Sequence, residues 1–457
     1  MPLRLRNAIY TLMLTLTVAA GLMRPAIAQN DDGGPISLLR DAEIETILRT
    51  WWTPIVLAAG LDPHAVHIYI VNDPRLNSFV AGGQNLFLNS GTLLRSTSPN
   101  QIVGIMAHET GHIAGGHLSR APAAMHKATI ASLIAMVAGA AVAVAGHSPD
   151  AGAAAILGGA GVGEQSYMHF SVGIEAAADH AAMTFLDRAH MSARGLLQFF
   201  HILEQEELLS AEREDPYLRD HPLTRDRVAY IEEHVAHSPW SNVPDPPAWI
   251  AMHARMKAKL AAFLDPPAQT LATYKADDDS IPARYARAIA YYRIPELKKA
   301  LALIDGLIAQ SPRDPYFREL KGQMLFENGK VKDAIAPYQR AVALDPGSAL
   351  LKIELAQVEL EDGDKALVPQ AMTLLNAAST YEGDNGELWR LLAIAYGRSG
   401  DMGMMSLSLA EQGMATGSYA DARQQAMRAV KLLPPGAQRQ RAQDIADDAK
   451  RQRKRED

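Results

Sequence analysis

The five residues His108-Glu109-Thr110-Gly111-His112 constrain this chain more than any other stretch, because they continue an apolar run that begins at Gln101. If the run is a helix, the two histidines lie one turn apart on the same face, with Glu109 to one side. Two imidazoles at this spacing can hold one Zn²⁺, and the glutamate can take a proton from water at the metal. Chance matches to so short a motif are common. The alternative is a helix with two surface histidines and an unrelated glutamate.

Composition limits the chemistry further. The chain has 457 residues, which is long enough for two or three domains. Its net charge of −7 argues against nucleic acid as the main partner. It contains no cysteine, which excludes a thiolate nucleophile, cysteine-ligated zinc and disulfides. Any metal must therefore be bound by His, Asp and Glu.

The N-terminus has the pattern of a secretory signal. Arg4 and Arg6 precede an apolar run over residues 8–23, and Ala26-Ile27-Ala28 supplies the small residues of a signal-peptidase site. We expect residues 1–28 to be cleaved and the mature chain to begin at Gln29, in the periplasm of a bacterial cell. The alternative is an N-terminal membrane anchor.

The segment before the motif predicts a helix over residues 36–61 and strands over 66–71 and 84–88. In zinc proteases a strand beside the metal commonly receives the substrate backbone as an added strand. Gln84, Asn85 and Leu86 are therefore a candidate substrate-binding strand. An ordinary sheet strand is the alternative.

A third histidine, His117, follows the motif. Metzincins place their third ligand six residues after the second histidine, and His117 is one residue short of that position. We expect it to be a polar or packing residue.

An apolar segment rich in Ala and Gly follows at residues 128–163. Its larger apolar residues fall mostly on one helical face, so it predicts a helical hairpin that packs on the protein or makes peripheral contact with a membrane surface. A true membrane span is the alternative.

The next helical pattern contains Glu175 and Asp179, one turn apart. A hydrolytic zinc site needs three protein ligands and a water, and a glutamate from a second helix is a common third ligand. Glu175 fits that role. Asp179 could accept a proton from the outer nitrogen of a zinc-bound imidazole, or donate one to a reacting group. Alternatively, both are solvated helix charges, although their neighbours are Ala and apolar residues.

His221 precedes Pro222, whose ring restricts the loop. It could approach the metal as a fourth ligand or act as a transition-state donor. A structural loop histidine is the alternative.

The rest of the chain has a different organisation. Residues 29–238 form the predicted metalloprotease domain, and residues 239–280 a Pro-rich connecting segment with one helix. From residue 281 to 434, several positions recur after 34 residues, including Pro312 with Pro346 and Gly329 with Gly363. This interval predicts tetratricopeptide (TPR) repeats with a peptide-binding face, or a purely structural superhelix. Residues 435–457 form a charged C-terminal helix or tail.

These motifs together resemble the zinc metallopeptidase family that includes HtpX and the CAAX prenyl proteases, as a periplasmic, repeat-bearing member. The resemblance rests on five features of the sequence: His108-Glu109-x-x-His112, Ser171-x-x-x-Glu175-x-x-Ala178-Asp179, the Asn72-Asp73-Pro74 turn with Asn77-x-Phe79, His221-Pro222, and the C-terminal repeats. Val172 departs from the family, in which an arginine often follows the serine of the second motif.

The resemblance implies a mainly α-helical fold, in which a gluzincin-like domain with a small β-sheet precedes a TPR superhelix. It implies one Zn²⁺ held by His108, His112 and Glu175, with Glu109 as general base and Asp179 as a proton donor or a residue that supports a ligand. It also implies quality control and assembly of outer-membrane proteins. The partners would be unfolded or misassembled outer-membrane proteins, with the assembly machinery bound through the repeats. The alternative function is a TPR chaperone or adaptor in which proteolysis is minor or regulated.

Overall fold

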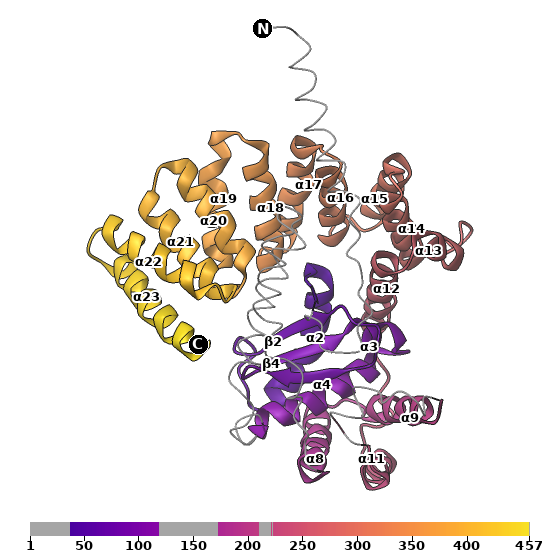
Figure 1. Cartoon of the computed structure of the whole chain (residues 1–457). Helices are drawn as coiled ribbons and strands as arrows, with labels where there is room; N and C mark the ends of the chain where they lie inside the picture. The colour runs from indigo at the N-terminus through magenta and orange to yellow at the C-terminus, as the bar shows by residue number, and fades with distance from the viewer. Residues whose placement is uncertain (1–36, 118–171, 210–220, 222, 457) are drawn as a thin grey trace. The chain divides into compact units, whose positions relative to one another are not determined.

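The computed structural model describes residues 37–117, 172–209, 221 and 223–456. These residues form many helices and one small sheet, followed by a series of helix pairs, so the predicted fold class is confirmed (Figure 1). The predicted signal segment, 1–28, and the predicted hairpin, 128–163, lie outside the described residues.

The sheet has four strands in the order β1-β2-β4-β3. Strands β2 and β4 are parallel, and β1 and β3 pair antiparallel with β2 and β4 respectively. Side chains alternate between the two faces, so Ile68, Ile70, Leu86 and Leu88 all enter the main hydrophobic core. The bounds of the strands are Leu38–Leu39 for β1, His67–Val71 for β2, Ser78–Ala81 for β3 and Asn85–Asn89 for β4.

The position of β4 contradicts its predicted role in substrate binding. Gln84, Asn85 and Leu86 were a candidate substrate-binding strand, with an ordinary sheet strand as the alternative, but β4 is hydrogen-bonded to β2 on one side and to β3 on the other. A strand paired on both sides has no free backbone groups for an added strand. The prediction was wrong because strand order is set by long-range pairing, which local alternation does not reveal.

Helix α2 (Ala42–Ala58) begins later than the predicted helix over 36–61, because residues 38–39 belong to β1. The Asp41 side chain accepts a hydrogen bond from the Ile44 amide and so caps the helix N-terminus. Trp51 and Trp52 are buried in the hydrophobic core.

Helix α4 (Pro99–Ala114) carries the two motif histidines and is buried from Gln101 to Ile113. Ser98 caps it and Pro99 occupies its first turn, which is the usual position for proline in a helix. Among the described residues, the domain also contains α8 (Val172–Arg188), α9 (Arg194–Leu209) and α11 (Arg225–His237). A short helix, α3 (Ser90–Arg95), connects β4 to α4.

The connecting segment contains two helices, α12 (Pro247–Leu264) and α13 (Pro267–Thr273), where one was predicted. Two faces of α12 belong to two different hydrophobic clusters. Met256 and Leu260 pack in the core of the first domain, whereas Ala258 and Ala262 pack with the first helices of the second. Helix α12 is therefore a structural element of both domains.

The second domain is a series of antiparallel helix pairs (Figure 1). The 34-residue interval has a structural counterpart, since Gly329 and Gly363 both adopt left-handed backbone angles, with φ +73° and +80°, after the first helix of successive pairs. The helices are α14 (Ile281–Arg293), α15 (Leu297–Gln310), α16 (Tyr316–Glu327), α17 (Val331–Leu344), α18 (Ala349–Asp362), α19 (Val368–Ala378), α20 (Gly386–Ser399), α21 (Met402–Ala415), α22 (Tyr419–Leu432) and α23 (Ala437–Glu456).

The charged C-terminal segment forms helix α23, whose Ala442, Ile445 and Ala446 pack with residues of α21 and α22. None of the described helices combines the length and the hydrophobicity needed to cross a bilayer.

Candidate metal centre

Helix α8 packs closely against α4 at Gly111, which has no side chain. A Cβ atom on Gly111 would lie only 2.7 Å from the Ala178 carbonyl oxygen, so glycine inside the histidine motif permits this close approach. Glu175 and Asp179 flank Ala178 on α8 and are both fully buried. The contact therefore brings two carboxylates of one helix to two imidazoles of the other.

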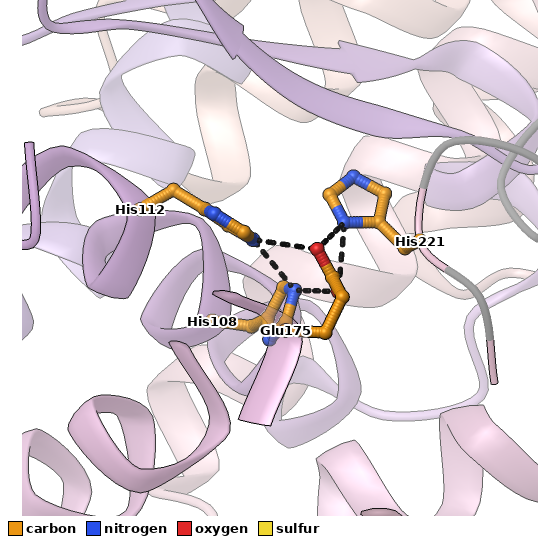
Figure 2. Close-up of side chains that lie close together, drawn as sticks. All are labelled: His108, His112, Glu175 and His221. Carbon is orange, nitrogen blue, oxygen red and sulfur yellow. Dashed lines mark hydrogen bonds and ion pairs between the residues drawn. The ribbon is translucent and has the colours of Figure 1, made fainter. Parts of the chain in front are cut away.

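Four side chains converge at this point: His108, His112, Glu175 and His221 (Figure 2). All four are buried, and one potential ligand atom of each lies within 4.8 Å of all the others. The Nε2 atoms of His108 and His112 are 3.1 Å apart. The Glu175 carboxylate lies between the rings, with Oε2 3.3 Å from His108 Nε2 and Oε1 3.4 Å from His112 Nε2.

These separations fit a bound metal ion. A tetrahedral ion with bonds of about 2.0–2.1 Å holds its ligand atoms roughly 3.3 Å apart. The described residues thus supply two imidazole nitrogens and a carboxylate, one oxygen of which lies near each nitrogen, at separations close to those that zinc and similar divalent ions require. The pKa of His112 lies well below its ordinary value, mainly because the ring is buried and secondly because of the positive charge of His108. The low pKa favours the neutral imidazole, which is the form that binds metals.

Glu109 lies beside this group without joining it. Its Oε1 accepts a hydrogen bond of 2.7 Å from the Ser78 hydroxyl on β3, and both residues are fully buried. Its Oε2 is also buried and has no hydrogen-bond partner among the residues that the structure describes. One oxygen of Glu109 is therefore held in place, while the other remains available to a reacting molecule.

Asp179 supports His108 from behind. Asp179 Oδ1 lies 2.9 Å from His108 Nδ1, the nitrogen opposite the cluster. Burial alone would lower the pKa of His108, but the hydrogen bonds to Asp179 and Glu175 outweigh it and raise that pKa to about 9. Burial would raise the pKa of Asp179, but hydrogen bonds from His108 and Arg227 bring it below its ordinary value.

Arg227 is a site residue that sequence reasoning missed. Its Nε donates to Asp179 Oδ2 at 2.6 Å, its Nη2 donates to Asp179 Oδ1 at 3.0 Å, and its Nη1 lies 3.1 Å from Glu175 Oε2. Arg227 is only 3% exposed, and its guanidinium bridges the two carboxylates of α8. The sequence offered one signal, an arginine six residues after the candidate ligand His221, and the structure places this arginine in the first turn of α11.

His221 reaches the cluster from the other side. Its Nδ1 lies 3.1 Å from Glu175 Oε2 and 3.2 Å from Glu175 Oε1, and its Nε2 donates to the Ser78 carbonyl oxygen at 3.2 Å. Figure 2 shows its ring on a segment separate from the helix that carries His108 and His112. The structure therefore brings together all six predicted catalytic and ligand residues, His108, Glu109, His112, Glu175, Asp179 and His221.

The sequence over residues 39–235 matches the model of peptidase family M48. The buried histidines and glutamate all fall inside that match. Residues 39–235 are a peptidase family M48 domain. The chain is a metalloprotease, and further along it matches two tetratricopeptide repeat models, over residues 283–349 and 325–394.

Proteins named beta-barrel assembly-enhancing protease are similar to this chain over much of its length. The one from Yersinia pestis is 23% identical over 371 residues, which cover 79% of this chain and 74% of the relative. The one from Escherichia coli (strain K12) is 22% identical over 379 residues, with the same coverage of both chains. A crystal structure of YrrB, a TPR protein with an unusual peptide-binding site, matches 40% of this chain at 16% identity and a TM-score of 0.32.

Proposed function

We propose that this M48 protease is a zinc-dependent endopeptidase of the periplasm that cleaves unfolded or misassembled outer-membrane proteins and assists the assembly of others. The observation that carries the proposal is the convergence of His108, His112 and Glu175 at the ligand spacing of a tetrahedral ion, with Glu109 beside them. The outer-membrane role is supported by the name of the relatives, and the periplasm by the signal pattern in residues 1–28.

The residues divide into distinct roles. His108, His112 and Glu175 would hold the zinc ion, which when bound polarises a peptide carbonyl and lowers the pKa of water. Glu109 would accept the proton of the attacking water at its unpartnered Oε2 and pass it to the leaving amine. Asp179 would accept the Nδ1 proton of His108 and so fix the tautomer that presents Nε2 to the metal.

Two roles change in the light of the fold. Strand β3 replaces β4 as the candidate for binding the substrate backbone, since within the described sheet it pairs only with β4 and carries Ser78 beside Glu109. His221 already lies among the ligands in this structure, so we assign it to the metal as a fourth ligand that substrate or water replaces. The repeats would bind the substrate or an assembly partner.

The decisive experiment combines metal analysis with cleavage. The purified mature protein should contain one zinc per chain and cleave an unfolded outer-membrane protein, and a chelator should stop cleavage. Glu109→Gln should keep the zinc and lose cleavage, whereas Glu204→Gln, a partly exposed glutamate on α9, should keep both. Cleavage by Glu109→Gln at the wild-type rate would contradict the proposed mechanism.

A genetic test separates this function from that of a chaperone or adaptor. Wild type should complement a deletion strain for outer-membrane protein assembly. If Glu109→Gln complements equally well, the repeats rather than proteolysis carry the function.

A further inference from the structure

His117 returns to the metal centre through a tight turn at the end of α4. Gly115 ends the helix, and Gly116 adopts a left-handed conformation with φ +60°. That angle is strained for residues with a side chain, and it turns the chain back so that His117 lies against the helix it has just left. The residue is only 6% exposed. The pair of glycines thus places a buried histidine beside the motif.

The His117 ring contacts the ring of His112. The Nδ1 atoms of the two residues are 3.0 Å apart, and the ring centroids are 5.1 Å apart at an interplanar angle of 77°. His112 Nε2 faces the cluster, so this nitrogen must be unprotonated when it binds a metal, and the proton must be on Nδ1. The His112 Nδ1–H then donates to His117 Nδ1, and the His117 proton lies on Nε2.

The other edge of the His117 ring packs against the backbone of Gly115. A Cβ atom on Gly115 would meet the His117 Nε2 atom and would lie 2.8 Å from both Cδ2 and Cε1. The ring is therefore wedged between His112 and the end of α4. Among the described residues, the group that could hold a metal does not include His117.

We propose that His117 is a positioning residue, whose Nδ1 accepts the hydrogen bond that fixes the tautomer and ring rotation of the metal ligand His112. The proposal rests on the metal site of the proposed function. Each imidazole ligand then has its own hydrogen-bond partner as a support: Asp179 behind His108, and His117 behind His112. Each support acts through the ligand it holds.

Charge explains why the second support is an imidazole. Among the described residues, the buried centre already contains three carboxylates, Glu109, Glu175 and Asp179, which face the guanidinium of Arg227 and the imidazoles of the site. A further carboxylate behind His112 would add a fourth buried negative charge to the metal-free protein, which is costly. A neutral imidazole supplies the same acceptor without that charge.

The experiment measures zinc affinity of the full mature chain by competition with a chromophoric chelator at fixed pH. His117→Phe keeps a ring but removes the acceptor, and should weaken zinc binding about 10- to 100-fold, the range usual for loss of a ligand's hydrogen-bond partner. His117→Gln restores a side-chain acceptor and should recover most of the affinity. His201→Phe, a partly exposed histidine on α9, should match wild type.

The outcomes separate this inference from the proposed function. If wild type binds no zinc, the metal site itself is wrong. If wild type binds zinc and His117→Phe binds it equally well, or if His117→Gln loses as much affinity as His117→Phe, the positioning role is overturned. Should His117→Phe fail to fold, His117→Leu removes the same acceptor with a smaller side chain and is expected to show the same loss.

Discussion

Asp179 Oδ1 lies 2.9 Å from His108 Nδ1, so a carboxylate on α8 holds a proposed ligand on α4 from the side opposite the cluster of His112 and Glu175. The two residues are 71 positions apart in the sequence and both are fully buried. The other Asp179 oxygen accepts from Arg227, so Arg227, Asp179 and His108 form a connected chain of three side chains.

Asp179→Asn should weaken zinc binding about 10- to 100-fold. The asparagine oxygen can accept from His108 only if its amide group then faces the guanidinium of Arg227, which places two donors together. Chelator competition measures the effect. Asp187→Asn, two turns further along α8 and partly exposed, is the control and should bind zinc as wild type does. Equal affinities in the two variants would show that Asp179 does not support the ligand.

Arg227→Met should destabilise the metal-free protein by roughly 3–5 kcal/mol, because it removes the guanidinium that pairs with the buried carboxylates of Asp179 and Glu175. Denaturant unfolding in the presence of chelator measures this. Arg287→Met removes a similarly buried guanidinium that donates to backbone carbonyls, and should cost less. The double variant Arg227→Met with Asp179→Asn should be more stable than the sum of the single effects predicts.

Gly115→Ala should reduce zinc affinity although it changes no polar group. The added methyl occupies the space of the His117 ring, which must move away from His112. We expect a loss comparable to that of His117→Phe. Gly306→Ala on α15 is the control, since a Cβ atom there meets nothing within 4 Å and alanine should favour the helix by about 1 kcal/mol. Wild-type zinc affinity in Gly115→Ala would contradict the packing argument.

The metal-free protein should lose stability as pH rises from 8 to 9.5. The pKa of His108 is raised to about 9, so the folded protein binds this proton more tightly than the unfolded chain. That stabilisation is fully present below pH 6.5 and is lost as pH rises through 9. The pKa values of His112, Glu175 and Asp179 are lowered, so these groups change the stability at pH values below 8.

The expected loss is about 1–2 kcal/mol in the free energy of unfolding. Three carboxyl groups with a pKa of about 7, those of Glu319, Glu327 and Glu359, have largely titrated by pH 8, which sets the start of the comparison. His108→Asn should lose this decrease, and the exposed His64→Asn should keep it. Bound zinc should also abolish it, since the metal replaces the proton on His108.

The sequence by itself determined the parts of this protein that depend on local geometry. His108 and His112 lie one turn apart because they are four residues apart on a helix, and the same holds for Glu175 and Asp179. The 34-residue interval likewise predicted the repeats, because each helix pair packs mainly on its neighbours.

Only the tertiary structure decided which distant groups meet. The partners of Glu109, Asp179 and His221 are 31, 48 and 46 residues away in the sequence, in Ser78, Arg227 and Glu175. Strand order placed β4 inside the sheet for the same reason. Periodicity reports which face of an element is buried, whereas pairing between elements depends on packing over the whole domain. The sequence thus identified the candidate metal ligands, and the fold supplied the side chains that hold them.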